Sequence, residues 1–298
     1  MFLVNVIVPV VLIAGAGYVF ARFVKFDLTP FTRLSFYVLS PALIFQSMLT
    51  SSISGITLAR VALFVFAAHG ALLLLGFVGV RWTRWDADTK ASALLSFTFS
   101  NCGNYGLPVL LFAFGDAGFT LGVVYMVVHQ VYQILFGVSV ASWRRGMSVR
   151  TVVWKVLTVP WLYALALALA LRALSLDLPL AIARPIELVA SAAIPIQLLL
   201  LGMALAGAKV GSLIRQAAPI SMAKLVVPPL LAWGLTAAFG FEGLLRAVLI
   251  LEASTPTAVN ALVLSLQYER RAELAASVIL LTTIAGVATT TLLLWLLS

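Results

Sequence analysis

The sequence predicts an all-α integral membrane protein with ten transmembrane helices, arranged as two inverted repeats of five, in which helices 4 and 9 are broken. Composition is the first observation: of 298 residues, 63% are hydrophobic and 10% are charged, and the mean hydropathy is +1.12. These values lie far outside the range of soluble domains. The second observation is a series of apolar runs, each long enough to cross a bilayer core of about 30 Å. They cover residues 2–21, 32–50, 60–80, 91–114, 118–142, 152–173, 180–207, 216–239, 243–266 and 272–297.

The basic residues predict the orientation of these runs. Of the 19 Lys and Arg residues, 14 fall in connections 1–2, 3–4, 5–6, 7–8 and 9–10, which share one side of the membrane. The opposite side holds four, namely Arg60, Arg172, Arg184 and Arg246. An excess of Lys and Arg marks the cytoplasmic side, so we expect a multi-pass protein of the inner (plasma) membrane with both termini outside the cytoplasm. The net charge of +9 then follows from topology and argues against a nucleic-acid partner.

An internal repeat is predicted on either side of the basic connection WRRGMSVR, residues 143–150. Each half holds five runs, and an odd number places the second half upside down in the membrane. Landmarks recur at offsets of about 151 to 155 residues, although prolines are common in membrane helices and coincidence is the alternative. The matched pairs are Pro9 with Pro160, Pro41 with Pro195, Arg60 with Arg215, His69 with Lys224, and Asn101 with Pro256.

The distribution of polar residues predicts four blocks. Helices 1–2 (residues 1–59) and 6–7 (143–207) are almost purely apolar, which is typical of a scaffold that faces lipid or another subunit. Helices 3–5 (60–142) and 8–10 (208–298) carry nearly all the intramembrane polar groups, so we expect them to form a transport core.

Two polar stretches interrupt the runs of helices 4 and 9, and they are the third observation. SNCGNYGLPV (100–109) holds Asn101, Asn104, Gly106 and Pro108, and EASTPTAVN begins at Glu252. Gly and Pro disfavour helix, and irregular backbone inside a bilayer persists only where protein buries it or where it lines a wet cavity. Interrupted helices in corresponding places of two halves indicate the binding site of a secondary transporter. A simple kink packed around by neighbours is the alternative.

The interruptions favour an anionic ligand. Helices that restart near Pro108 and Pro256 present unpaired N–H groups and the positive ends of their dipoles. The amides of Asn101, Asn104 and Asn260 can donate to a carboxylate, and Thr255 adds a hydroxyl. The site therefore needs no Arg within the membrane.

Ionisable groups at membrane depth are candidate functional residues. Glu252 and Lys224 are candidates for ion coupling, and Glu252 is the first candidate to take a proton or to help hold Na⁺. A structural ion pair between Glu252 and Lys224 is the alternative. His129 and Gln133 place polar groups on neighbouring faces of one helix, for contact with substrate or proton or for hydrogen-bonded packing. Apart from a possible Na⁺ near Glu252, we expect no metal and no cofactor. The single cysteine, Cys102, allows no disulfide within the chain.

Three stretches resemble the auxin efflux carrier family of membrane transporters, in its bacterial branch: SNCGNYGLPV, KLVVPPL from Lys224, and LEASTPTAVNALVLSLQY from Leu251. The resemblance covers the whole chain. It implies the fold of bile acid/sodium symporters and sodium/proton antiporters, in which helices 4 and 9 unwind and cross in a transport domain beside a scaffold that often dimerises.

The resemblance also implies substrates that are small organic anions, such as malate, malonate and other carboxylates, or auxin in plants. The crossover positions carried onto this chain are Asn101, Asn104, Pro108, Pro256 and Asn260. Glu252 is similar to the cation-binding acidic residue of the bile acid symporters. Plant members have a long loop between the halves, which this chain lacks, so the regulatory features of that loop do not transfer.

We therefore expect a secondary carrier of a small organic anion, with alternating access of elevator type, coupled to H⁺ or Na⁺. Uncoupled export driven by the membrane potential is one alternative. A sodium symporter for bile-acid-like amphipathic acids and a cation/proton antiporter are others on the same fold. A membrane sensor or receptor could use the same pocket, and measured flux distinguishes it from a carrier. An enzyme is disfavoured, because the sequence lacks HExxH and has two His and one Cys.

Overall fold

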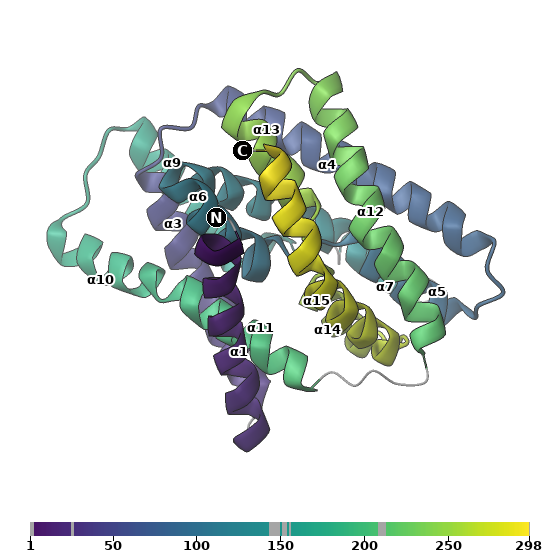
Figure 1. The fold of residues 1–298 in the computed structure, drawn as a ribbon. Helices are drawn as coiled ribbons and strands as arrows, with labels where there is room; N and C mark the ends of the chain where they lie inside the picture. The colour runs from purple at the N-terminus through teal and green to yellow at the C-terminus, as the bar shows by residue number, and fades with distance from the viewer. Residues whose placement is uncertain are drawn as a thin grey trace.

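The computed structural model describes residues 3–24, 27–142, 150, 154, 156–207 and 213–297, and this part of the chain is helical apart from turns and one isolated β-bridge (Figure 1). The helices are η1 (Leu3–Ile7), α1 (Val8–Phe23), α2 (Leu28–Leu34), η2 (Ser35–Leu39), α3 (Ser40–Leu49), α4 (Gly55–Arg81), α5 (Ala87–Thr98), η3 (Cys102–Gly106), α6 (Leu107–Tyr132), η4 (Gln133–Gly137), α7 (Val138–Ala141), α9 (Pro160–Ala173), α10 (Leu180–Ser191), α11 (Ala193–Gly207), α12 (Ile214–Ala238), α13 (Gly243–Ala253), α14 (Val259–Gln267) and α15 (Ala272–Leu297). The elements labelled η are π-helical turns.

Seven helical stretches in the described residues are long and apolar enough to cross a membrane, so this is a multi-pass membrane protein. They are Asn5–Phe23, Leu28–Leu49, Gly55–Arg81, Cys102–Ala141, Leu180–Gly207, Ile214–Ala238 and Ala272–Leu297.

This count is lower than the ten expected runs for identifiable reasons. The stretch Cys102–Ala141 contains a break at Gly115, where φ is 62° and ψ is −158°. The ninth run is divided between α13, with 11 residues, and α14, with nine, while α9 has 14. In the sixth run, residues 152, 153 and 155 lie outside the described residues. The ten-helix inverted repeat stays a prediction.

Glycines allow α1 and α11 to touch through their backbones. A Cβ atom added at Gly202 would overlap the carbonyl oxygen of Ala14 and lie 2.8 Å from the backbone nitrogen of Tyr18. A Cβ added at Gly17 would likewise lie 2.9 Å from the Leu199 Cα. Small residues permit this close packing in membrane helices, where dispersion contacts replace the hydrophobic effect as the driving force.

Replacing Gly202 by Ala is expected to destabilise the protein by about 1–3 kcal/mol, because backbone atoms of the facing helix cannot rotate away as a side chain would. Gly207→Ala is the matched control on the same helix, since a Cβ there meets nothing within 4 Å. Thermal unfolding of the purified variants in detergent measures the difference. Equal unfolding temperatures for the two variants would contradict the close approach of α1 and α11.

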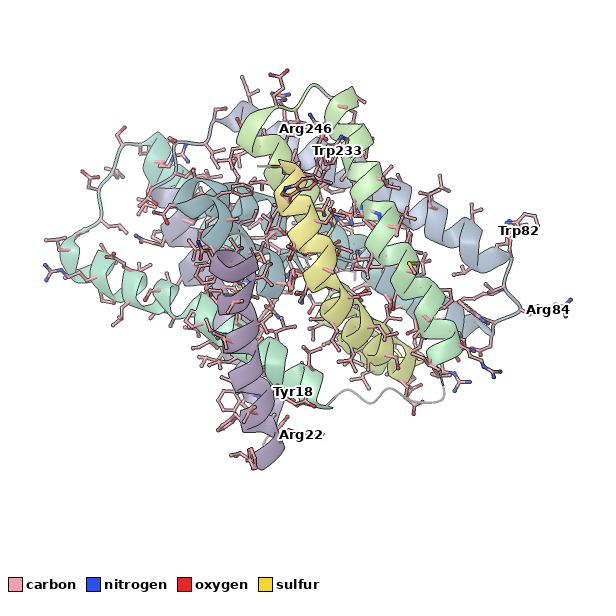
Figure 2. The ribbon with its side chains drawn as sticks, in the orientation of Figure 1. Tyr18, Arg22, Trp82, Arg84, Trp233 and Arg246 are labelled. Atoms are coloured by element: carbon pink, nitrogen blue, oxygen red, sulfur yellow. The ribbon has the colours of Figure 1, made fainter. Side chains whose placement is uncertain are left out.

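Three of the four arginines on the predicted outer side have structural partners. Arg172 donates to the carbonyl oxygens of Ile53 at 2.7 Å and Met48 at 3.3 Å. Arg60 donates to the carbonyl oxygen of Gly240 at 3.2 Å. Arg246 lies over the Trp233 ring at 5.2 Å (Figure 2). Arg172 and Arg60 thus bind backbone carbonyl groups of distant segments, and Arg246 packs on a ring of α12.

The helices that carry the polar interruptions pack against one another. α4 contacts α5 and α6, and α13 contacts α4, α6, α12 and α15. α12 and α15 run alongside each other, with α14 beside α15 (Figure 1). α3 packs against α9 and α10, and α1 packs against α11. The division into scaffold and core blocks stays a prediction, and its boundaries near 143 and 208 lie outside the described residues.

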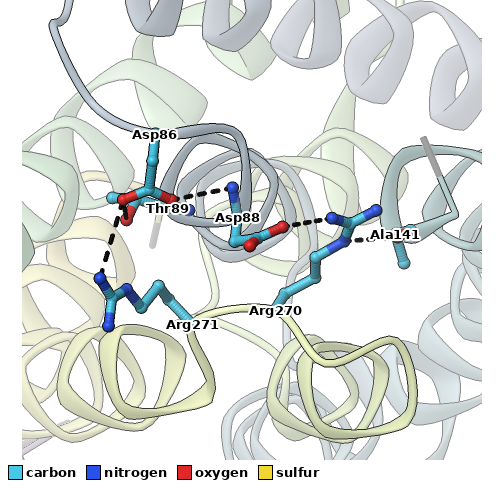
Figure 3. Close-up of polar contacts among 6 residues, drawn as sticks. All are labelled: Asp86, Asp88, Thr89, Ala141, Arg270 and Arg271. Atoms are coloured by element: carbon cyan, nitrogen blue, oxygen red, sulfur yellow. Dashed lines mark hydrogen bonds and ion pairs between the residues drawn. The ribbon is translucent and has the colours of Figure 1, made fainter. Parts of the chain in front are cut away.

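An ionic cluster fastens the start of α5 to the α14–α15 connection (Figure 3). Asp86 caps α5 by accepting from the backbone N–H of Thr89 at 2.9 Å and of Asp88 at 3.0 Å, and the Thr89 bond holds the pKa of Asp86 below its usual range. Arg271 lies 3.8 Å from Asp86, and Arg270 pairs with Asp88. Arg270 also donates to the carbonyl oxygen of Ala141 at 2.7 Å. The cluster joins three segments at the end that is predicted to face the cytoplasm.

Candidate functional site

Both predicted interruptions are present. α5 ends at Thr98, Phe99 is extended (φ −94°, ψ 128°), and the chain resumes helix in η3 and α6 after Asn101. In the second half α13 ends at Ala253, and α14 begins after Ala258, which is extended (φ −65°, ψ 138°). Each run is therefore two helices joined by a short stretch of open backbone.

The two open stretches pair with each other. Ser100 and Thr257 form an isolated antiparallel β-bridge. The Asn101 N–H donates to the Pro256 carbonyl oxygen at 2.8 Å, and the Ala258 N–H donates to the Phe99 carbonyl oxygen at 3.0 Å. Pairing satisfies backbone groups that a membrane interior would otherwise leave unbonded. The two open stretches of this chain therefore cross each other, and we call this place the crossing. They are not independent kinks.

Hydroxyl groups of Ser100, Thr257 and Thr282 hold the crossing in place. Thr257 donates through Oγ1 to the Ser96 carbonyl oxygen at 2.8 Å, and its own N–H donates to Thr282 Oγ1 at 3.1 Å. Ser100 donates through Oγ to the Ala253 carbonyl oxygen at 2.9 Å. The sequence does not reveal the partners of these hydroxyls, because the partners lie up to 161 positions away in the chain.

The crossing brings the starts of two helices together. The first N–H groups of a helix have no acceptor within it, and the dipoles of η3–α6 and α14 place partial positive charge at these ends. Pro108 lies at the second position of α6, directly after the π-helical turn η3. Pro256 lies in the open stretch and accepts from Asn101. The arrangement is a point of positive potential, and one basic side chain, Lys224, also reaches it by donating to Ser100 Oγ at 2.8 Å.

Side-chain amides lie next to these helix starts. Asn101 is 5% exposed, and its Nδ2 has no hydrogen-bond partner in the described part of the chain. Asn104 is partly exposed. Asn260 donates through Nδ2 to Gln133 Oε1 at 2.7 Å, and Gln133 Nε2 is likewise without a partner among the described residues. Buried donors without acceptors are costly, so these N–H groups are suited to a ligand that brings acceptor oxygens.

His129 lies beside the first open stretch and bonds its backbone. Its Nε2 accepts from the Ser100 backbone N–H at 3.4 Å, and its Nδ1 lies 3.2 Å from Cys102 Sγ. Its ring centroid is 4.4 Å from that of His69, which bonds the Thr98 carbonyl oxygen at 3.0 Å. With 1% exposure for His129, this arrangement favours hydrogen-bonded packing over direct contact with substrate.

Glu252 is fully buried and lies against two glycines. A Cβ added at Gly106 would overlap its Oε2 and lie 2.7 Å from its Cδ, and a Cβ at Gly122 would lie 3.0 Å from Oε1. Within the described residues neither carboxyl oxygen has a hydrogen-bond partner. Thr255 bonds only the backbone oxygen of Glu252, at 2.9 Å. The sequence identifies the acidic residue, and only the fold shows the glycines that make room for it.

Lys224 has a different partner. Its Nζ donates to Ser100 Oγ at 2.8 Å, and the ion pairs described for this chain do not include one between Lys224 and Glu252. The alternative of a structural Lys224–Glu252 pair is therefore wrong for this conformation. Lys224 instead anchors the first open stretch of the crossing from α12.

A large cavity lies at the predicted outer side of the protein. It has a volume of about 1000 Å³ and is lined by α3, α10, the loop after α3 and the Gly115 region of α6. Its lining includes Asp116, Glu187 and Leu121. The next residue in the chain, Gly122, lies against Glu252. Neither Glu252 nor the paired residues of the crossing line this cavity.

Comparison with known proteins assigns the chain to a family. The family described as membrane transport protein matches residues 2–149 and 144–296. A protein of Methanothermobacter thermautotrophicus, named as an uncharacterized transporter, is 26% identical over 262 residues, which cover 87% of this chain and 85% of that protein. The resemblance to auxin efflux carriers is thereby confirmed. The chain belongs to the membrane transport protein family of auxin efflux carriers.

Proposed function

We propose that this protein is a secondary carrier of a small organic anion, such as a carboxylate, that binds where the two interrupted helices cross. The antiparallel bridge between Ser100 and Thr257 carries the proposal, because it directs two helix starts toward one place. Helix N-termini attract carboxylates, and the unbonded amide donors of Asn101 and Gln133 supply further hydrogen bonds.

Movement of the core against the scaffold would expose this site to each side in turn. The cavity of about 1000 Å³ lies between α3 and α10 on one side and α6 on the other, where such movement would open a path. In this proposal residues 1–59 and 143–207 form the scaffold and a homodimer contact, and 60–142 and 208–298 form the moving core. Both termini then lie outside the cytoplasm of a cell whose plasma membrane holds the carrier.

Glu252 is the proposed site of the coupling ion, a proton or Na⁺. An ionised carboxylate removed from water without hydrogen bonds costs several kcal/mol, so a proton or a cation must compensate it. The carboxyl group lies next to Gly106 in η3, and any change in its charge would act directly on the helix start that holds the anion. Substrate binding and ion binding are thereby coupled through one contact.

Asn104→Ala and Asn260→Ala are each expected to lower carboxylate transport by roughly tenfold to hundredfold, because a hydrogen bond to a charged group contributes about 1.5–3 kcal/mol. The measurement is uptake of labelled dicarboxylates and monocarboxylates into proteoliposomes. Asn5→Ala is the matched control, since Asn5 is the remaining asparagine of the chain and is exposed.

Two outcomes would count against the proposal. If both amide variants transport at the wild-type rate, the crossing is not the anion site. If purified wild-type protein binds carboxylates, as judged by thermal shift, yet shows no flux in sealed vesicles, the protein is a sensor and not a carrier.

A further inference from the structure

A second cavity lies at the opposite end of the core, between the end of α4 and the start of α5. Its volume is about 270 Å³. It is lined by Phe77, Val80, Arg81, Ala87, Lys90, Ala91, Leu94 and Arg270. None of these residues belongs to the crossing, and the proposed carrier function gives this cavity no role.

Three positive side chains from separate segments converge on this cavity. Arg81 ends α4, Lys90 lies in the first turn of α5, and Arg270 comes from the α14–α15 connection. The lining includes no acidic residue. The nearest carboxylates already have partners, since Asp88 pairs with Arg270 and Asp86 lies 3.8 Å from Arg271 (Figure 3). In the described structure the side chains of Arg81 and Lys90 have no hydrogen bond or ion pair, so two positive charges are available.

The rest of the cavity wall is apolar and continues onto the outer face of α4. Phe77 and Val80 line the cavity, and Leu74 and Val78 on the same helix are 63% and 47% exposed. Trp82 follows directly and is 84% exposed, pointing away from the helices (Figure 2). Trp is enriched where the hydrocarbon meets the headgroups. The site is therefore cationic at the membrane surface and apolar toward the membrane interior.

We propose that this cavity binds an anionic phospholipid of the cytoplasmic leaflet, with its phosphate between Arg81 and Lys90 and an acyl chain along α4. Basic pockets between transmembrane helices on the cytoplasmic side suit acidic headgroups. A soluble phosphate would use the charges but leave the apolar wall and the exposed face of α4 uncovered. The proposal is independent of the transported substrate.

The position of the lipid gives it a structural consequence. α5 runs from this cavity directly to Thr98, where the crossing begins. Arg270 connects the cavity wall to Asp88 of α5 and to the Ala141 carbonyl oxygen after η4. A lipid bound to Arg81 and Lys90 would join α4 to this cluster and hold the start of α5 in place.

Binding is tested on the full-length protein in detergent, titrated with phosphatidylglycerol and measured by native mass spectrometry. In the double variant Arg81→Gln and Lys90→Gln, the affinity for phosphatidylglycerol is expected to fall about 30-fold. Each lost positive charge accounts for about a fivefold loss of binding to an anionic lipid. Arg33→Gln combined with Arg84→Gln is the control, because it removes the same charge from exposed residues outside the cavity. That control should bind within about twofold of wild type.

Three results would overturn the proposal. One is equal loss of affinity in the cavity variant and the control variant, which would mean a diffuse surface charge effect. Another is equally tight binding of phosphatidylcholine, which has no net charge. The third is full competition by glycerol phosphate at concentrations equal to the lipid, which would assign the cavity to a soluble phosphate compound.

Discussion

Glu252→Gln is expected to abolish ion-driven accumulation of the substrate while the protein remains folded. The glutamine has nearly the shape of a protonated glutamate but cannot release a proton or balance the charge of a cation. One proton per transport cycle and a gradient of one pH unit would give about tenfold accumulation in the wild type. In the variant the internal substrate concentration should only equal the external one, and its dependence on pH and Na⁺ should disappear.

The measurement compares substrate accumulation in proteoliposomes with an imposed pH gradient, with a Na⁺ gradient and with neither. Glu273→Gln is the control, since Glu273 is exposed in the first turn of α15. The gradient that loses its effect in Glu252→Gln identifies the coupling ion. Retention of both gradient effects in Glu252→Gln would remove this residue from the coupling mechanism and leave transport through the crossing as a separate question.

Gly106→Ala is expected to destabilise the protein by about 1–3 kcal/mol and to impair coupling, because the new methyl group would overlap the Glu252 carboxyl group. The carboxyl group cannot retreat easily, since Gly122 closes its other side and the side chain is fully buried. Gly103→Ala is the control in the same π-helical turn. Its methyl group would lie 3.2 Å from the flexible Met126 thioether sulfur, which can rotate away.

A double variant distinguishes steric conflict from a general need for glycine. Glu252→Ala removes the carboxyl group and leaves space that the methyl group added by Gly106→Ala would partly fill. Thermal unfolding should therefore show the double variant to be more stable than the sum of the two single effects, with a coupling energy of about 0.5–3 kcal/mol. Coupled transport should stay absent. Additive effects on stability would show that Gly106 and Glu252 do not make the contact described here.

The sequence was sufficient to locate both interruptions, because Gly, Pro and Asn in an apolar run conflict with a continuous helix. It also identified Glu252, Lys224 and the amides of Asn101 and Asn260, since polar groups at membrane depth are rare. The sequence could not show which residue each of these polar groups contacts in the folded protein. Lys224 was weighed as a partner of Glu252, whereas the structure places its Nζ on Ser100 Oγ, 124 positions away.

The number of membrane helices also differs between the prediction from the sequence and the structure. Hydropathy predicts ten crossings, yet the described chain contains seven long apolar stretches, since α13 and α14 are each too short to be counted alone. A hydropathy profile averages the residues in a window, so it does not detect where the backbone departs from helical geometry. The bridge between Ser100 and Thr257 joins residues of different halves, and backbone pairing of this kind leaves no local trace in the side chains.

The sequence alone determined that this is a membrane protein with two broken helices and a buried acid, because the cost of polar groups in hydrocarbon is a property of each residue. The tertiary structure decided which broken ends meet, that His129 supports the backbone of Ser100, and that Gly106 and Gly122 border the Glu252 carboxyl group. Those contacts depend on distances between segments that are far apart in the chain, and packing of the whole chain sets such distances.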